Sequence, residues 1–242
     1  MKITASTDLG CKHTENQDFY RAGRLADDTY WIVLCDGMGG VTDGGTASRM
    51  AGEYLQEQIQ KNVVDLPTPE SVKDFMLDAV RRCNRKIYAF SQEGETAITM
   101  GTTVVMALVR QNLAQIVHAG DSRAYLVSRG TVKLLTKDHS IVQELLDDGK
   151  ITPEQALNHP NKNIITSALG VDAETRIDYD ESRFIKGDNL VLCSDGLSNM
   201  VAESKILEIV RDEEFYRSAE KLVKRAVDAG GYDNITAVVL RA

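Results

Sequence analysis

Five aspartates of the sequence stand at the ends of apolar runs or in glycine-rich turns, where a short side chain has little freedom. They are Asp18, Asp36, Asp121, Asp195 and Asp233. Carboxylates brought together repel one another, and burying them side by side is costly without a counter-ion. A hard divalent cation removes that cost, and oxygen ligands favour Mg²⁺ or Mn²⁺. The pattern predicts a cation site if the fold gathers these carboxylates.

The surroundings of two of these aspartates differ from those of ordinary turns. Asp36 follows an apolar run and precedes Gly37-Met38-Gly39-Gly40, and Asp195 follows another apolar run and precedes Gly196. Glycine lets the backbone approach closely and leaves a carbonyl oxygen free to act as a ligand. A lone Asp-Gly pair is usually only a turn, and Asp43-Gly44 is interpreted in that way.

Short β-rich runs are predicted as the strands that hold these side chains. They are Tyr30–Cys35, Thr102–Val109, Ala114–Ala119, Ala124–Val127, Thr131–Leu135, Asn189–Cys193 and Thr236–Leu240. The breaks between the runs from residue 102 to residue 135 are too short for a crossover helix. Those runs are therefore predicted to form an antiparallel meander.

Apolar residues at helical spacing predict helices over residues 47–59, 206–210 and 219–227. Another helix is predicted from Thr68, a capping residue followed by a proline, to about Ile87. Strands grouped in the middle with long helices outside indicate an α+β layered domain. No linker or repeat interrupts residues 1–242, so one domain is expected.

Residues 138–166 differ from the rest and are called the flap below. The stretch is polar, with a short predicted helix at Ile141–Leu146 and a capping box at Thr152-Pro153-Glu154-Gln155. A polar insertion between strands predicts a surface subdomain that acts as a lid or a substrate contact.

Composition limits the class of partner. The net charge is −8, with 26% charged and 43% apolar residues, as in a soluble globular protein. An acidic surface argues against nucleic acid, and the apolar runs are too short to cross a membrane. No signal peptide is evident at Met1, so a cytoplasmic location is expected. An acidic protein that binds phosphate needs cations to bridge the two.

Cysteine and histidine chemistry is poorly supported. The cysteines lack CxxC spacing, and Cys35 and Cys193 lie in apolar runs, as core residues would. The histidines lack HxxxH or HxH spacing, which argues against a histidine-bound metal. His118 is interpreted as a core residue, and His139 and His159 as loop residues.

Short motifs run along almost the whole chain in a characteristic order. They include Asn16-Gln17-Asp18, Cys35-Asp36-Gly37-Met38-Gly39-Gly40, Gly101-Thr102-Thr103, Gly120-Asp121-Ser122-Arg123, Asp138-His139-Ser140, Ser194-Asp195-Gly196 and Gly231-Tyr232-Asp233-Asn234. At these residues the chain resembles the metal-dependent protein phosphatases of type 2C (the PPM family), in their compact bacterial form. The resemblance implies a four-layer α/β/β/α sandwich of two antiparallel sheets flanked by helices, with a small flap subdomain.

The resemblance also implies a centre of two or three divalent cations, Mn²⁺ or Mg²⁺. Asp36 would bridge two cations, and Gly37 would bind through its carbonyl oxygen. Asp195 and Asp233 would complete the ligands of the first cation. Asp121 with Asp195 would hold a third, more weakly bound cation.

Two further residues would support this centre. Asp18 would act in catalysis by hydrogen-bonding a metal-bound water, and Asn234 would hold the ligands in place.

The phosphate-binding position departs from the family pattern. Where the family usually has Arg, this chain has His13, which is only partly charged near neutral pH. The neighbouring Lys12 would point the other way in a strand. Met38 stands where animal members have a His proposed as general acid, so no protein side chain is assigned that role.

The function implied is a protein serine/threonine phosphatase that hydrolyses phosphoserine and phosphothreonine by direct attack of a metal-bridging water or hydroxide. The expected partners are phosphoproteins, with a Ser/Thr protein kinase and its substrates by analogy, and the expected state is a monomer. The alternative is a catalytically weak phosphoprotein-binding regulator with the same fold. The retained Asp36, Asp195 and Asp233 argue against that alternative.

Overall fold

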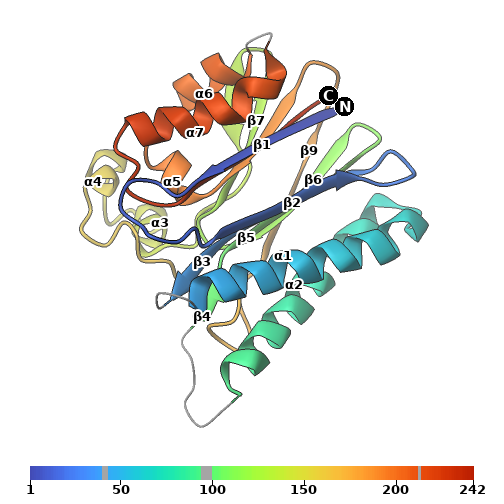
Figure 1. The fold of residues 1–242 in the computed structure, drawn as a ribbon, viewed down its shortest axis with the longest axis horizontal. Coiled ribbons are helices and arrows are strands. Elements are labelled where there is room, and N and C mark those ends of the chain that lie inside the picture. The colour runs from blue at the N-terminus through green and yellow to red at the C-terminus, as the bar shows by residue number, and fades with distance from the viewer. Residues whose placement is uncertain (40–42, 94–99, 212–213) are drawn as a thin grey trace.

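Two antiparallel sheets form the centre of the computed structural model, which describes residues 1–39, 43–93, 100–211 and 214–242 (Figure 1). The five-stranded sheet has the order β1-β11-β10-β7-β8, and the six-stranded sheet has β2-β3-β5-β6-β9 with β4 paired to β3. The strands of the first sheet are β1 (Lys2–Asp8), β7 (Arg123–Ser128), β8 (Thr131–Leu134), β10 (Asn189–Cys193) and β11 (Ile235–Arg241). Those of the second are β2 (Asp18–Arg24), β3 (Tyr30–Gly39), β4 (Met100–Thr102), β5 (Val104–Arg110), β6 (Leu113–Ala119) and β9 (Asp178–Arg183).

Helices cover the outer face of each sheet (Figure 1). The six-stranded sheet carries α1 (Asp43–Asn62) and α2 (Pro69–Ser91), and the five-stranded sheet carries α5 (Asp195–Ser198), α6 (Glu203–Val210) and α7 (Ser218–Asp228). The flap contributes α3 (Ile141–Asp147) and α4 (Pro153–Leu157), and two short 3₁₀ turns lie at Val63–Asp65 and Phe215–Arg217. None of the helices in the described ranges is long and apolar enough to cross a membrane.

Three apolar clusters fill the three spaces between these four layers. Along β3, Trp31 and Val33 pack towards α1 and α2, whereas Ile32 and Leu34 pack towards the other sheet. This alternation is the period of two that a strand buried on both faces requires. The third cluster lies under α5, α6 and α7 and includes Val191 and Leu222. The four-layer α/β/β/α arrangement is thereby confirmed.

The helix starts follow from local hydrogen bonding. Thr68 accepts a hydrogen bond from the backbone N–H of Ser71, and Pro69 follows it at the first position of α2. Thr152 and Gln155 form the predicted capping box of α4. These bonds satisfy backbone groups that a helix end otherwise leaves unpaired.

The predicted meander is wrong at its centre. The strands β5 and β6 pair with each other, and so do β7 and β8, but β6 and β7 belong to different sheets. Gly120, with φ +107°, turns the chain out of the six-stranded sheet and into the five-stranded one. A short break excludes a crossover helix but does not show that the flanking strands pair.

Two smaller expectations are also wrong. Asp43 and Gly44 are not an isolated turn, because they form the first residues of α1. Lys12 and His13 lie in a loop between β1 and β2 rather than in a strand, so alternation does not determine where they point. Gly40, the last residue of the motif after Asp36, lies outside the described residues.

Candidate metal centre

Asp36 is fixed at the edge of the six-stranded sheet by the Gly101-Thr102-Thr103 motif. Its carbonyl oxygen accepts hydrogen bonds from the N–H of Thr103 (2.8 Å) and the hydroxyl of Thr102 (2.9 Å). Its own N–H donates to Oγ1 of Thr103 at 3.0 Å. With the backbone held on both sides, the carboxylate is carried by a single methylene group on a rigid base.

Asp18 lies opposite Asp36 in the β2–β3 pair. Its Oδ2 accepts a hydrogen bond of 2.7 Å from the hydroxyl of Ser194, which belongs to the chain just after β10 of the other sheet. Its Oδ1 is buried and has no hydrogen-bond partner among the described residues. One oxygen of Asp18 is therefore available to a ligand.

Asp195 and Asp233 come from the five-stranded sheet, at the end of β10 and before β11. Oδ2 of Asp195 accepts a hydrogen bond from the side chain of Asn199 at 3.1 Å. Its Oδ1 is buried and, within the described part of the chain, without a hydrogen-bond partner. Asp233 is half-exposed, and its Oδ1 accepts the N–H of Asn234 at 2.7 Å.

Asp121 stands where the chain passes from β6 in one sheet to β7 in the other. The next residue, Ser122, is buried, and its hydroxyl shares a 2.7 Å hydrogen bond with Thr103. Because Thr103 also holds Asp36, one hydrogen-bonded group fixes the positions of both aspartates.

The structure brings most of the predicted site residues to one cavity of about 250 Å³. The predicted residues that line it are His13, Asp36, Gly37, Asp121, Asp195, Asp233 and Asn234. Asp18 lines a neighbouring hollow with Glu15 and Asn16 instead. It still lies near enough to Asp195 and Asp233 for their charges to raise its pKa.

The carboxylates disfavour one another's charge. Burial, with repulsion from the neighbouring aspartates, raises the pKa of Asp36 well above its usual range. Burial raises the pKa of Asp18 to about 7, that of Asp121 to about 7 and that of Asp195 to about 6. The cavity contains the unpartnered oxygen of Asp195, and no Lys or Arg is among the described residues that line it, which fits a divalent cation.

Two glycines allow backbone segments to pack closely around the carboxylates. A Cβ on Gly37 would lie 2.2 Å from the carbonyl oxygen of Gly44, and one on Gly196 would lie 2.1 Å from that of Asn234. Both distances are far below van der Waals contact. The Asp-Gly pairs therefore reflect close packing of backbone around the carboxylates, rather than a need for unusual backbone angles.

Asn234 organises the loop between β1 and β2. Its side-chain amide donates to the carbonyl oxygens of Leu9 (2.9 Å) and Glu15 (3.1 Å), and its Oδ1 accepts the N–H of Gln17 at 2.8 Å. That loop carries His13, whose Nε2 lies 3.2 Å from Oδ1 of Asp233. His13 therefore faces the carboxylates across the cavity mouth.

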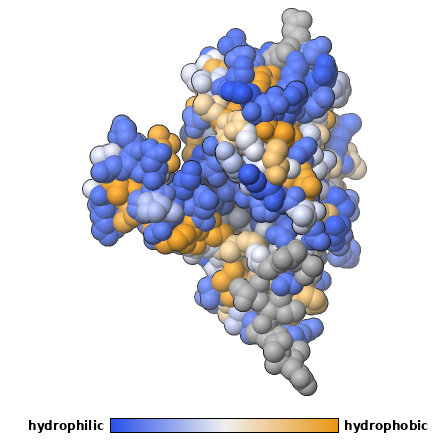
Figure 2. Space-filling view, turned by 60° about the vertical axis from the view of Figure 1, so that its left-hand side comes forward, coloured by the Kyte–Doolittle hydropathy of each residue, from blue (hydrophilic) through white to orange (hydrophobic). Residues whose placement is uncertain are grey.

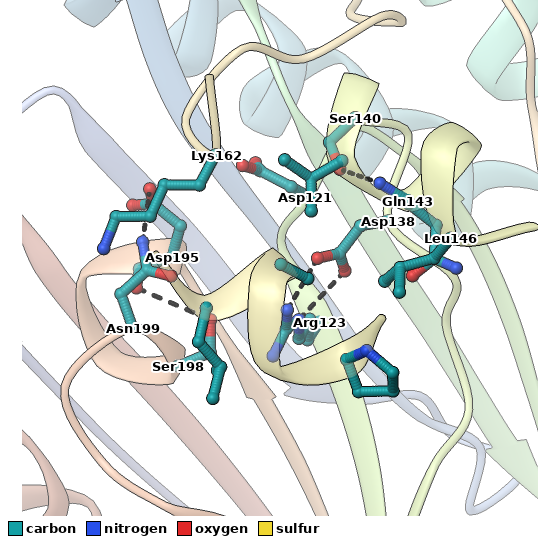
Figure 3. Close-up of a pocket in the computed structure, with 14 residues that line it drawn as sticks. Asp121, Arg123, Asp138, Ser140, Gln143, Leu146, Lys162, Asp195, Ser198 and Asn199 are labelled. Atoms are coloured by element: carbon teal, nitrogen blue, oxygen red, sulfur yellow. Dashed lines mark hydrogen bonds and ion pairs between the residues drawn. The ribbon is translucent and has the colours of Figure 1, made fainter. Parts of the chain in front are cut away.

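A second cavity, of about 310 Å³, adjoins the first and runs beneath the flap (Figure 3). Asp121 and Asp195 line both cavities. The far wall is partly apolar, with Val142 and Leu146 of α3, and Lys162 lies across from them. A group bound at the carboxylates could extend into this cleft without a break.

Several supporting residues lie within the sequence motifs, but the sequence assigned them no contacts. Ser194 bonds Asp18, and Ser122 bonds Thr103, and neither contact is indicated by spacing along the chain. Arg123 forms two hydrogen bonds, of 2.9 and 2.6 Å, with Asp138 at the start of the flap. The spacing of that pair along the chain gives no indication of the contact.

On the face shown in Figure 2, hydrophilic side chains predominate, and apolar ones lie among them in small groups. The most exposed large apolar side chains of the described residues are those of Leu157, Tyr216 and Tyr232. Leu157 belongs to the wall of the cleft beneath the flap, where an apolar side chain can meet a bound partner.

Several known proteins that are similar to this chain are named as phosphatases. A family model described as protein phosphatase 2C matches residues 11–234. The serine/threonine phosphatase Stp of Listeria monocytogenes serotype 4b is 36% identical over 235 residues, covering 97% of this chain and 93% of the relative. The protein phosphatase PhpP of Streptococcus pneumoniae is 39% identical over 246 residues, covering 99% and 97%.

Solved structures agree with the sequence relatives. The serine/threonine phosphatase of S. agalactiae has a TM-score of 0.93 at 35% identity, covering 100% of this chain and 99% of that one. The catalytic domain of the phosphatase PstP, solved in complex with two manganese ions, has a TM-score of 0.82 at 35% identity, covering 98% and 96%. The chain belongs to the protein phosphatase 2C family.

Proposed function

We propose that this chain is a protein serine/threonine phosphatase that removes phosphate from phosphoserine and phosphothreonine, with two or three Mn²⁺ or Mg²⁺ ions as cofactors. The observation that carries the proposal is the cavity lined by four aspartates from both sheets. The buried, unpartnered oxygens of Asp18 and Asp195 support the same conclusion. Its relatives Stp and PhpP are named as phosphatases, and PstP was solved with two manganese ions.

Each ligand has a proposed role. Asp36, whose carboxylate is near all the others, would bridge two cations, with the Gly37 carbonyl oxygen as an additional ligand. Asp195 and Asp233 would complete the ligands of the first cation. Asp121, which lies between the two sheets and near Asp195, would hold a third cation with Asp195.

The bound cations would neutralise phosphate charge and activate a water for in-line attack. The chain's own residues would do the remaining work. Oδ1 of Asp18 can accept a proton or a hydrogen bond from that water, because it has no other described partner. His13 at the cavity mouth would contact the phosphate, and the adjoining cleft would receive the peptide around the phosphorylated residue.

Domain organisation and cellular setting complete the proposal. Residues 1–242 would form one catalytic domain with residues 138–166 as its flap, acting as a monomer in the cytoplasm. A Ser/Thr protein kinase and its substrates are the proposed partners, since a phosphatase needs a source of phosphoprotein. The net charge of −8 is unfavourable for binding nucleic acid.

The test is phosphate release from a phosphothreonine peptide, with Mn²⁺ and with excess EDTA. Turnover that requires Mn²⁺ and disappears in Asp36→Ala would support the phosphatase. Tight binding of the phosphopeptide without turnover, in either Mn²⁺ or Mg²⁺, would instead favour the catalytically weak regulator.

A further inference from the structure

Two buried histidines lie beside the metal centre without lining its cavity. The rings of His118, at the end of β6, and His139, at the start of the flap, stack with centroids 4.8 Å apart and an interplanar angle of 28°. Their residues are 2% and 1% exposed. They connect the Asp121 turn to the base of the flap.

Hydrogen bonds around the rings indicate where each carries its proton. Nε2 of His118 lies 2.9 Å from the carbonyl oxygen of Lys137 and 3.3 Å from the N–H nitrogen of the same residue, so the shorter contact favours a proton on Nε2. Nδ1 of His139 accepts the N–H of Gly120 at 3.3 Å and so carries no proton. Burial lowers the pKa of both histidines, which favours their neutral forms.

His139 binds both polar backbone groups of Gly120. Its ring accepts the N–H of Gly120, and its own N–H donates to the carbonyl oxygen of Gly120 at 3.0 Å. Its carbonyl oxygen accepts the N–H of Thr166 at 2.8 Å, at the other end of the flap. A single residue thus joins the turn before Asp121 to both ends of the flap.

The turn at Gly120 needs contacts from other residues to hold its backbone conformation. Gly120 has φ +107°, where only glycine is comfortable, and a Cβ there would lie 2.6 Å from the Thr103 side chain. Ordering the backbone of a glycine costs conformational entropy. Two hydrogen bonds from His139 offset that cost next to a proposed ligand.

We propose that His139 is a positioning residue for Asp121: its ring nitrogen Nδ1 and its backbone N–H hold Gly120 so that Asp121 can bind the weakest cation, and the stacked His118 keeps the ring in place. The inference rests on the proposed function, because the cation role of Asp121 belongs to it. His139 touches neither the substrate nor a cation.

A metal ion held by the histidines themselves is the rival explanation. His118, His139 and Asp178 could place three ligand atoms around one ion. Arg176, however, already donates to both oxygens of Asp178, at 3.1 and 2.6 Å. An ion on Nε2 of a neutral His139 would also move the ring proton to Nδ1, against the N–H of Gly120. Nε2 of His139 lies 3.1 Å from Oδ2 of Asp178, although the two are not aligned as a hydrogen bond.

Two amide variants separate positioning from packing. In His139→Asn the amide oxygen can take the place of Nδ1 and accept the Gly120 N–H. In His139→Gln the amide lies near the position of Nε2 and leaves that N–H unpaired. Both variants lose the ring, so their thermal unfolding without metal should fall similarly.

Calorimetric titration with Mn²⁺ gives the readout. We expect His139→Gln to weaken the weakest Mn²⁺ site about tenfold, as losing an outer partner of a metal ligand does, and His139→Asn to stay within about threefold of the wild type. The tighter sites should be unchanged in both. Equal weakening in the two variants, or none in either, would overturn the inference.

Two further measurements, both begun on the wild-type protein, keep the inference testable if the His139 variants fail to fold. Nitrogen chemical shifts of the His139 ring should report a neutral ring with the proton on Nε2; a proton on Nδ1 would contradict the inference. One Zn²⁺ bound in excess of the aspartate sites and lost in His118→Leu would establish the rival metal site. If the wild type binds no Mn²⁺, that result contradicts the proposed function itself and not only the role of His139.

Discussion

Asp18 and Asp36 face each other directly across the β2–β3 ladder, so two carboxylates share one cross-strand pair. Like charges in that position destabilise a sheet. The repulsion is increased by Asp195 and Asp233, which approach from the other sheet. The protein therefore holds, near its active cavity, an unfavourable charge cluster that a cation would relieve.

Replacing Asp36 by Asn should have opposite effects on activity and on metal-free stability. We expect kcat/KM for a phosphothreonine peptide to fall more than about 100-fold, because losing only an outer partner of a ligand costs 10–100-fold. Without metal, the variant should unfold at a higher temperature than the wild type, since a buried group that must either carry a repelling charge or take up a proton is gone. Enzyme assay and thermal unfolding in EDTA measure the two effects.

Asp148→Asn, in the exposed part of the flap, is the matched control and should change neither quantity. Wild-type activity in Asp36→Asn would refute the assignment of Asp36 as the bridging ligand. A lower melting temperature in EDTA would show that the repulsion has been overestimated.

Metal-free protein should lose stability as the pH rises from about 4 to about 7. Burial raises the pKa of Asp18 to about 7, of Asp121 to about 7 and of Asp195 to about 6, against 3.8 as the ordinary value. The folded state therefore retains protons that the unfolded chain releases first, and stability present below pH 3.8 is lost as the pH rises through the folded pKa values.

Thermal unfolding in EDTA at pH 5 and pH 8 tests this dependence. The melting temperature should be lower at pH 8, and Mn²⁺ at about 100 times its dissociation constant should add about 2.7 kcal/mol there. A metal-free melting temperature that is the same or higher at pH 8 would mean that the carboxylates are not mutually destabilising.

Gly196→Ala should damage both the fold and the metal centre. The new methyl group would lie 2.1 Å from the carbonyl oxygen of Asn234, so the Asp233–Asn234 backbone must move. We expect a loss of about 1–3 kcal/mol in the free energy of unfolding, typical of overpacking, and weaker Mn²⁺ binding by calorimetry.

Gly45→Ala in α1 provides the comparison, because its Cβ would meet nothing closer than 3.9 Å. A helical position gains up to about 1 kcal/mol from alanine. If the two variants behaved alike, the close approach at Gly196 would not be a constraint.

His13→Arg should lower the KM for phosphopeptide several-fold. Nε2 of His13 lies 3.2 Å from Asp233 at the cavity mouth, and arginine would place a permanent, forked cation there. Steady-state kinetics of the two proteins on the same phosphopeptide give the comparison. A KM unchanged from the wild type would mean that residue 13 does not contact the phosphate.

Much of the secondary structure follows from the sequence pattern alone. The strand predicted at Asn189–Cys193 has the same bounds in the structure, and the capping residues Thr68 and Thr152 begin their helices as expected. These features depend on local spacing and hydrogen bonding, which the sequence contains. The separation of β6 and β7 into different sheets does not, because a strand buried on both faces looks the same in either sheet.

The candidate site, like the fold, was predictable in its local features but not in its long-range contacts. Aspartates at the ends of buried strands could be identified, since strand ends and glycines are local signals. The hydrogen bonds of Thr103 to Asp36 and of Ser194 to Asp18 join distant segments and became evident only in the fold. The stacked pair of His118 and His139 is hidden for the same reason, although one was expected in the core and the other in a loop.

The pairing of β1 with β11 has a consequence for synthesis. The two strands lie side by side in the five-stranded sheet, and β11 directly follows Asp233. A growing chain holds Asp18 and Asp36 early but cannot fix Asp233 beside them until β11 has emerged and added to the sheet. Contacts between such distant segments form slowly. A nascent chain therefore has an incomplete carboxylate cluster until β11 is in place.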